Sequence, residues 1–254
     1  MPDPYFLGID AGSRYTKFAL MHDREIIELL IRPSGWQTKE LAAEVTAELC
    51  RRHGIFPDSL WVTATGYGRV SIDADTVVTE ITCHAIGAHY LCPSVRTVID
   101  VGGQDSKIIC VDETGAVTDF LMNDKCAAGT GKFIEMMLQT LGAEFSTLDS
   151  VVAGVEPVHV TSTCAVFAES EIIGLMASGA DRAAVLAGVI ESAAARIGSL
   201  ASRLRVADAV FFSGGLCRSA ALRSAVSVRL GRDVITDENA PFAGAIGAAL
   251  CRPK

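Results

Sequence analysis

The chain has 254 residues, of which 50% are hydrophobic and 20% charged, so it is a folded protein of one or two domains rather than a disordered chain. Its 30 acidic and 22 basic residues give a formal net charge of -8, which argues against nucleic acid as the main partner. No stretch approaches the roughly 18 consecutive apolar residues of a membrane helix, and no basic leader precedes the first apolar run. We therefore expect a cytoplasmic protein without a membrane partner.

Strand-like and helix-like segments alternate along the chain, which is typical of an α/β fold. Strands are predicted over residues 5–9, 18–21, 60–63, 95–101, 106–111, 116–122 and 209–212. Helices are predicted over residues 39–53, from after 124 through 141, and over 165–177, 182–204, 219–230 and 242–250. In the first of these helices Thr38 is the expected N-cap and Gly54 the expected end.

Two segments of the sequence share the frame D-x-G-[SG]-x-x-[ST]-K. They cover residues 10–17 and 100–107, and apolar strand-like runs precede and follow each of them. Two copies with identical internal spacing predict a duplicated fold whose halves face each other across a cleft. The first lobe is expected over residues 1–94 and the second over 95–254, with the C-terminal helix able to pack back on the first. Two ordinary hairpins with Asp/Gly turns are the simpler alternative.

The residue types in these turns suit a nucleotide and Mg²⁺. Glycines let backbone N–H groups approach phosphate oxygens, hydroxyls and lysines add donors, and aspartates can hold Mg²⁺ through water. The candidate phosphate-binding residues are Gly12, Ser13, Thr16, Lys17, Gly102 and Gly103, and the candidate catalytic aspartates are Asp10 and Asp100. Gln104 is a candidate for orienting the attacking water, by analogy with other NTPases, although it can equally be an ordinary turn residue.

A third glycine turn, at residues 213–216, follows a predicted strand and precedes a helix. In a two-lobed nucleotide fold, adenosine would pack at this point, against Gly214 and Gly215. The small residues of the 244–249 segment predict a close helix contact. Together the turns resemble the actin/Hsp70/hexokinase-like ATPase superfamily, which implies a duplicated ribonuclease H-like fold with two lobes around a nucleotide cleft.

The eight cysteines include no C-x-x-C pair, and most are expected to be buried thiols. Cys126 and Cys164 differ because each lies close before a predicted helix, where the positive helix end would stabilise a thiolate or an anionic cluster. The N–H groups of Gly129 and Gly131 are expected to be free to point at sulfur. Two thiolates do not complete a four-cysteine site, so one [4Fe-4S] cluster would need a second copy of the chain. Buried or redox-inert thiols are the simpler alternative.

Eight stretches of the sequence resemble, in order and across nearly the whole chain, a known family. The most specific are MNDKCAAGTGKF and STC-x-VFAESE; the others are GIDAGSRYTK, ATGYGR, EITCHAIGA, VIDVGGQDSK, SGG and GAIGAAL. The chain resembles the activator (component A) of 2-hydroxyacyl-CoA dehydratases, within the wider family of ATPases that includes benzoyl-CoA reductase ATPase subunits.

This resemblance implies a homodimer with one bridging [4Fe-4S] cluster held by Cys126 and Cys164 of each subunit, and ATP or ADP with Mg²⁺ in each subunit's cleft. Gly129 and Lys132, beside the cysteine loop, are included among the cofactor-binding residues. The implied activity is ATP-dependent delivery of a low-potential electron, from a ferredoxin or flavodoxin donor, to an iron–sulfur enzyme. The sequence does not choose among a hydroxyacyl-CoA dehydratase, a benzoyl-CoA-reductase-like enzyme and another double-cubane protein as acceptor.

Three short segments depart from the family pattern, all at the expected nucleotide rim. They are residues 14–15, residues 216–219 and Pro241. Two other functions fit the phosphate turns without using the cysteines: an acceptor-phosphorylating kinase of the same fold, and an actin-like assembly or regulatory ATPase. If both sites are real, the 100–107 turn leads through two strands into the Cys126 loop, so nucleotide state can move the thiol-bearing segments.

Overall fold

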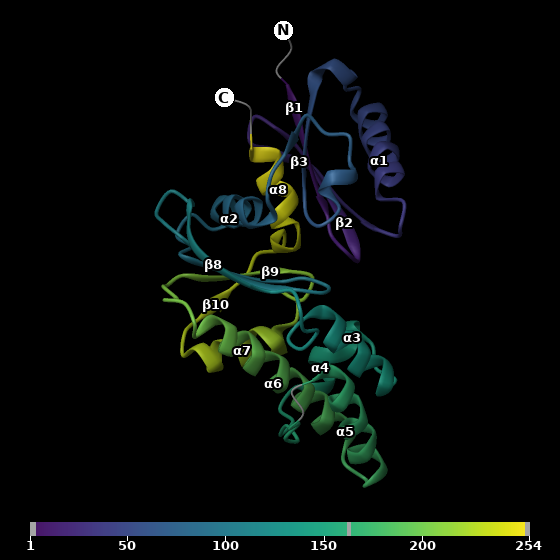
Figure 1. Cartoon of the computed structure of the whole chain (residues 1–254), viewed down its shortest axis with the longest axis vertical. Helices are drawn as coiled ribbons and strands as arrows, with labels where there is room; N and C mark the ends of the chain where they lie inside the picture. The colour runs from purple at the N-terminus through teal and green to yellow at the C-terminus, as the bar shows by residue number, and fades with distance from the viewer. Residues whose placement is uncertain (1–3, 162–163, 252–254) are drawn as a thin grey trace. The chain divides into compact units, whose positions relative to one another are not determined.

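The computed structural model describes residues 4–161 and 164–251. It divides into two compact units, and Figure 1 labels the helices and several strands of both. The first comprises Met1–Val95, Val111–Thr118 and Asn239–Lys254, and the second comprises Arg96–Cys110 and Asp119–Glu238. The last helix of the chain therefore belongs to the unit that contains the first strand.

The first unit is built on a five-stranded sheet with strand order β3-β2-β1-β4-β5. Its strands are β1 (Tyr5–Ala11), β2 (Tyr15–His22), β3 (Glu25–Pro33), β4 (Leu60–Thr65) and β5 (Thr76–Val77). Its helices are α1 (Thr38–His53), α2 (Glu80–Leu91) and α8 (Ala243–Leu250), with 3₁₀ turns η1 (Pro57–Ser59), η2 (Arg69–Ser71) and η4 (Ala240–Phe242).

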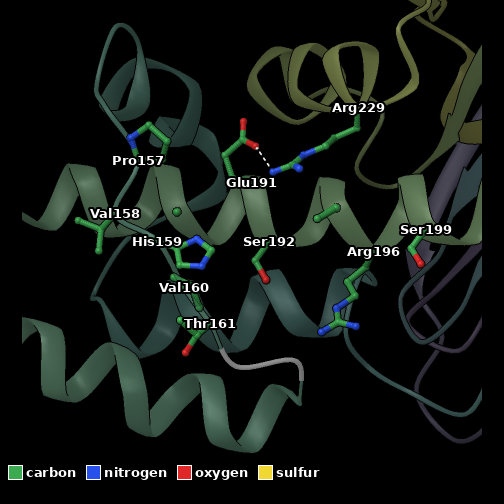
Figure 2. Close-up of a pocket in the computed structure, with 12 residues that line it drawn as sticks. Pro157, Val158, His159, Val160, Thr161, Glu191, Ser192, Arg196, Ser199 and Arg229 are labelled. Atoms are coloured by element: carbon green, nitrogen blue, oxygen red, sulfur yellow. Dashed lines mark hydrogen bonds and ion pairs between the residues drawn. The ribbon is translucent and has the colours of Figure 1, made fainter.

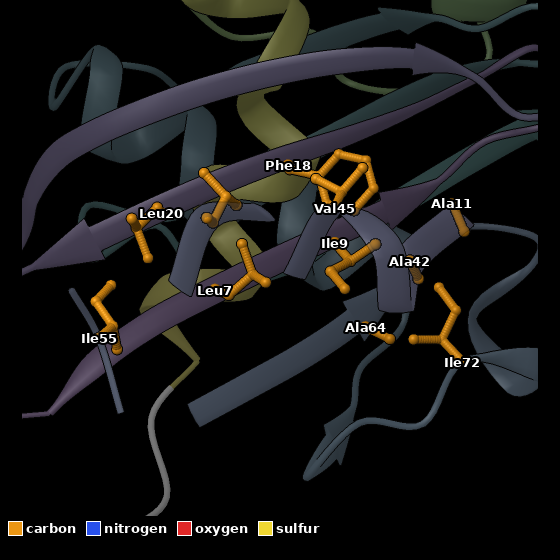
Figure 3. Close-up of a cluster of buried hydrophobic side chains, with 11 residues drawn as sticks. Leu7, Ile9, Ala11, Phe18, Leu20, Ala42, Val45, Ile55, Ala64 and Ile72 are labelled. Carbon is orange, nitrogen blue, oxygen red and sulfur yellow. The ribbon is translucent and has the colours of Figure 1, made fainter. Parts of the chain in front are cut away.

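The period-two pattern of β1 places apolar side chains on both faces of this sheet. Leu7 and Ile9 pack in one core with Val45 of α1, which Figure 3 shows. Phe6 packs in a second core with Ile246 of α8. The central strand is therefore covered by α1 on one face and by α8 on the other.

Small residues let α8 approach its neighbours closely. A Cβ added at Gly8 would clash with the backbone of Ala245, one at Gly87 with the backbone of Ala243, and one at Gly247 with the backbone of Cys83. The close helix contact predicted for the 244–249 segment is thus confirmed, with α2 and β1 as the elements it touches.

The second unit carries a sheet of order β10-β9-β6-β7-β8. Its strands are β6 (Thr97–Val101), β7 (Ser106–Val111), β8 (Val117–Asn123), β9 (Val210–Gly214) and β10 (Val234–Ile235), of which the end of β7 and the start of β8 fall in the first unit's share of the chain. Its helices are α3 (Gly131–Thr140), α4 (Leu148–Val152), α5 (Ala165–Ala177), α6 (Arg182–Ala201) and α7 (Ala220–Leu230), with the 3₁₀ turn η3 (Phe145–Thr147).

The two sheets have the same topology. In each sheet the first two strands of the chain are antiparallel, and the aspartate of the repeated frame lies opposite its lysine. These cross-strand pairs are Asp10 with Lys17 and Asp100 with Lys107. In each, the first strand also pairs in parallel with the strand that ends at Thr65 or at Gly214. The duplicated α/β fold predicted from the repeated frame is confirmed.

Several local predictions were wrong. Thr38 is the first residue of α1 rather than its N-cap, which is Gln37, and Gln37 makes no side-chain cap bond. The helix expected after residue 124 begins only at Gly131, because Gly129 has φ +81° and Thr130 is extended. The short or edge elements β3, β5, α4 and β10 were not predicted, and α6 ends three residues before residue 204.

By length and composition, α6 is the one helix in residues 4–161 and 164–251 that could cross a membrane. Ten of its residues are buried within the protein. It therefore has the burial of a core helix in the second unit.

Candidate functional site

The first phosphate turn joins β1 to β2. Asp10 is buried at the end of β1, and its Oδ2 lies 3.9 Å from Lys17 Nζ, which is the one ion pair of Lys17 among the described residues. Gly66 has φ +86°, and a Cβ there would lie 2.6 Å from Asp10 Oδ1. Only glycine therefore lets the chain after β4 pass this close to the carboxylate.

The two hydroxyls of this turn have different surroundings. Thr16 is fully buried, and its Oγ1 lies 3.0 Å from Ser34 Oγ, which in turn donates to the Gly12 carbonyl at 2.6 Å. Ser13 is exposed at the tip. Thr16 thus holds the turn in shape, and Ser13 is the hydroxyl open to a ligand.

The second phosphate turn joins β6 to β7 and is more tightly paired. Lys107 Nζ lies 3.4 Å from Asp100 Oδ2 and 2.8 Å from Asp105 Oδ2. Ser213 donates to Asp100 Oδ1 at 2.8 Å. Asp100 and Lys107 are both 2% exposed, and buried charges need such partners because burial removes them from water. Two carboxylates against one ammonium leave the turn with a net negative charge, which suits a divalent cation.

The two turns differ in the number of carboxylates that pair with their lysines. Asp105 in the second turn corresponds to Tyr15 in the first, so Lys17 lacks the second carboxylate that holds Lys107. Lys17 is also the more accessible of the two ammonium groups. Lys17 is thus the lysine with fewer carboxylate partners, and the second turn carries the larger excess of carboxylates.

The third turn lies between β9 and α7. Gly214 has φ +87° and packs so closely on Val101 that a Cβ would clash with its backbone, whereas Gly215 is exposed with open space around it. Gln104, in the second turn, is exposed as well. Gly214 therefore shapes the turn, and Gly215 and Gln104 remain open to a ligand.

A residue that sequence reasoning missed holds the end of this third turn. Ser219 Oγ donates to Asp149 Oδ1 at 2.7 Å, and the N–H groups of Ala220 and Ala221 donate to the same carboxylate at 2.8 and 3.1 Å. Burial alone would raise the pKa of the Asp149 carboxyl, but these hydrogen bonds bring it below its ordinary value. No local signal identifies Asp149, which stands 70 residues before its partner in the chain.

The two candidate cluster ligands have different settings. Cys164 is the half-buried N-cap residue of α5, as predicted, although Ser162 and Thr163 of its motif lie outside the described residues. Cys126 is exposed in the loop before α3, whose N-cap is Thr130. The prediction that both thiols lie at helix ends therefore holds only for Cys164.

The loop of Cys126 is tied to the second phosphate turn. Ser106 Oγ donates to the Gly129 carbonyl at 2.5 Å. The first two N–H groups of α3, those of Gly131 and Lys132, donate to the carbonyls of Gly102 and Gly103 at 2.9 and 2.8 Å. The expectation that the Gly131 N–H is free for sulfur is thus wrong, because that N–H is already used. Lys132 Nζ pairs with Glu135 at 3.3 Å.

A cavity of about 310 Å³ lies in the second unit, and Figure 2 shows its lining. Arg196 and Ser192 of α6 face it from one side and Thr161 from the other, while Glu191 pairs with Arg229 at 3.0 Å. None of the predicted nucleotide or cluster residues lines it.

The remaining thiols differ from Cys126 in exposure. Cys83 and Cys217 are buried, and the other four are partly buried. A hydrogen bond to Cys251, together with burial, raises the pKa of the Cys83 thiol. Within residues 4–161 and 164–251, no group of three or more His, Cys, Asp or Glu side chains forms a metal site. Cys126 is therefore the one exposed cysteine among the described residues, and Cys164 shares its intermediate burial with four other cysteines.

Comparisons with known proteins identify relatives that are similar along nearly the whole chain. The uncharacterized protein YjiL of Escherichia coli is 44% identical to this chain. The (R)-2-hydroxyglutaryl-CoA dehydratase activating ATPase of Acidaminococcus fermentans is 40% identical. Each alignment covers 97% of this chain and 96% of the relative's sequence. The activator of the 2-hydroxyisocaproyl-CoA dehydratase from Clostridium difficile, solved with bound ADPNP, superposes with TM-score 0.91 at 35% identity, covering 97% of this chain and 93% of its own.

A more distant likeness shows the fold alone. A ROK family glucokinase from Streptomyces griseus superposes with TM-score 0.58 at 14% identity, covering 96% of this chain and 98% of its own. The fold is of the actin/Hsp70/hexokinase-like class. The model of the BadF/BadG/BcrA/BcrD ATPase family matches residues 7–251, and this chain belongs to that family.

Proposed function

We propose that this protein is an ATP-dependent activator that delivers a low-potential electron to an iron–sulfur partner enzyme. The observation that carries the proposal is the pairing, within one unit, of an aspartate-rich phosphate turn with the loop of an exposed thiol, Cys126. The names of the relatives, an activating ATPase and an activator of acyl-CoA dehydratases, support the same function. A dehydratase of this kind is the proposed acceptor, and a ferredoxin or flavodoxin the proposed donor.

In the proposed ATPase reaction each turn has its own task. Lys17 and the N–H groups around Gly12 and Gly103 would neutralise phosphate charge, and Asp10 and Asp100 are the residues that would hold Mg²⁺, which supplies further positive charge to the phosphates. Gln104, exposed in the second turn, orients the attacking water. Adenosine packs against Gly215, where the structure leaves open space.

The thiols fit a [4Fe-4S] cluster shared by two copies of the chain. Cys126 and Cys164 would each supply one thiolate per subunit, giving four ligands about a twofold axis. When bound, the cluster supplies a one-electron carrier of low potential. Beside Cys164, Val166 and Phe167 are 63% and 68% exposed, and exposed apolar side chains next to a ligand site are typical of an interface. The α5 N-terminus adds a favourable electrostatic contribution for an anionic group at Cys164.

The test is iron and sulfide analysis of anaerobically purified protein, together with analytical ultracentrifugation. We expect a dimer with about two irons per chain, since one four-iron cluster is divided between two subunits. Cys126→Ser and Cys164→Ser should each abolish the absorbance near 400 nm, whereas Cys50→Ser and Cys110→Ser should retain it. A monomer with about four irons per chain would refute the bridging arrangement.

The competing function is a kinase of the same fold. A colourless monomer that consumes ATP only when an alcohol acceptor is added would favour the kinase. Activation of an acyl-CoA dehydratase that depends on both ATP and reductant would exclude it.

A further inference from the structure

The second phosphate turn contacts α3 through the backbone carbonyls of two glycines, Gly102 and Gly103. A peptide unit is planar, so its C=O and the following N–H move together. The Gly102 carbonyl shares a plane with the Gly103 N–H, and the Gly103 carbonyl shares one with the Gln104 N–H. Both carbonyls accept hydrogen bonds from the start of α3, at 2.9 and 2.8 Å. A phosphate that reorients these N–H groups therefore also reorients the acceptors of α3.

Gly102 packs tightly against Asp105 of the same turn, since a Cβ at Gly102 would lie 2.3 Å from Asp105 Oδ1 and the Gly102 N–H donates to the Asp105 carbonyl at 2.9 Å. A phosphate that displaces the turn therefore has to move Gly102 and Asp105 together. The hydrogen bonds of Gly131 and Lys132 must then follow or break, because those N–H groups have no earlier helical turn to bond to.

One side chain joins the same turn to the same loop. Ser106, 3% exposed, donates from Oγ to the Gly129 carbonyl at 2.5 Å. Gly129 itself has φ +81°, and a Cβ there would lie 2.8 Å from Arg196 Cβ on α6. Figure 2 shows Arg196 extending from α6. The loop is thus held between a hydroxyl of the phosphate turn and a helix that does not belong to the turn.

We propose that Ser106 is a positioning residue that transmits the nucleotide state of the second phosphate turn to the Cys126 loop, acting together with the Gly102 and Gly103 carbonyls. This inference rests on the proposed function, since it requires that the turn bind phosphate. It assigns Ser106 to coupling rather than to nucleotide binding, because its hydroxyl is turned to Gly129 and is buried.

Two substitutions of Ser106 and one control substitution test this role. Ser106→Ala removes the hydrogen bond to Gly129. Ser106→Thr retains a hydroxyl, and Thr is the residue that the first turn carries at this position, as Thr16. Thr97→Val is the control for loss of a buried hydroxyl elsewhere in the sheet. Thr97 donates to the Ala207 carbonyl at 2.9 Å and accepts from the Ala207 N–H at 3.0 Å, at the first residue of β6, so its loss is at least as disruptive.

The experiment measures hydrogen–deuterium exchange of the full chain with no nucleotide, with Mg–ADP and with a non-hydrolysable ATP analogue, and nucleotide Kd by calorimetry. In the unmodified protein we expect nucleotide to change exchange in residues 101–107 and 127–133 together. In Ser106→Ala the Kd and the change at 101–107 should persist, while the change at 127–133 falls by at least half. Basal exchange at 127–133 should rise about fivefold, the factor for one lost hydrogen bond.

The outcomes separate the two proposals. Restored coupling in Ser106→Thr, with unmodified behaviour in Thr97→Val, supports the transmitting role. Nucleotide binding without any change at 127–133, full coupling in Ser106→Ala, or equal loss in Thr97→Val overturns this inference and leaves the proposed function standing. Failure of the unmodified protein to bind nucleotide overturns both.

Discussion

Replacing Asp149 by alanine should destabilise the second unit more than removal of an ordinary helix cap does. The Asp149 carboxylate accepts three hydrogen bonds at the start of α7: one from Ser219 Oγ at 2.7 Å and two from backbone N–H groups at 2.8 and 3.1 Å. A helix N-terminus also carries partial positive charge, which a carboxylate stabilises. Alanine would leave all three donors without this partner.

The magnitude follows from comparison with a simpler cap. Asp181 caps α6 through one hydrogen bond, from the Ala184 N–H at 2.9 Å, and the loss of such a cap costs about 1 kcal/mol. Asp149 makes three bonds, but it is partly exposed and solvent screens its charge, so we expect about 2 kcal/mol for Asp149→Ala at pH 7. This corresponds to a fall in Tm of about 4–8 °C.

This stabilisation depends on pH in a defined direction. The folded-state pKa of Asp149 lies below its ordinary value of 3.8. A carboxyl with a lowered folded pKa stabilises the protein fully above its unfolded pKa, and the stabilisation disappears as pH falls through the folded pKa. The difference between the unmodified protein and Asp149→Ala should therefore be constant from neutral pH down to about pH 5 and shrink below about pH 4.

The assay is urea unfolding, followed by circular dichroism, of the unmodified protein, Asp149→Ala and Asp181→Ala at pH 7 and at pH 3. A cost for Asp149→Ala that does not exceed that for Asp181→Ala would refute the three-bond account. A cost that is no smaller at pH 3 than at pH 7 would refute the assignment of the carboxylate form.

Two further predictions concern the phosphate turns and the helix contact. Asp10→Ala and Lys17→Ala should weaken nucleotide binding at least tenfold by calorimetry while leaving iron content unchanged. Undiminished ATPase activity in both of these variants would remove the phosphate-site assignment. Gln104→Ala should lower ATP turnover more than nucleotide affinity. Gly247→Ala should cost about 1–3 kcal/mol or more in urea unfolding because its Cβ would clash with a backbone carbonyl of α2. Gly174→Ala, in open space on α5, is the control and should be neutral or stabilising.

The sequence was most informative where neighbouring residues do the chemistry. A phosphate turn is built from consecutive positions, so the frame shared by residues 10–17 and 100–107 predicted the duplicated fold that the two sheets confirm. The resemblance carried by MNDKCAAGTGKF and STC-x-VFAESE likewise led to the family. The helix α5, at Ala165–Ala177, was predicted with its bounds.

Prediction was weakest where stability comes from contacts distant in sequence. The edge strands β5 and β10 have two residues each, which is too short for a periodic signal, and they form because a neighbouring strand pairs with them. The start of α3 was predicted too early, after residue 124, because positive φ at Gly129 and the bond from Ser106 keep the preceding segment out of the helix.

By itself, then, the sequence determined the repeated turns, the fold class, the family and the pair of candidate thiols, because each of these depends on residues that are adjacent in the chain. Only the tertiary structure decided how their side chains are used. It pairs Lys107 with two carboxylates and Lys17 with one, brings Asp149 to the start of α7, and turns the Ser106 hydroxyl toward the Cys126 loop. These partners come from segments that folding brings together, so no local pattern encodes them.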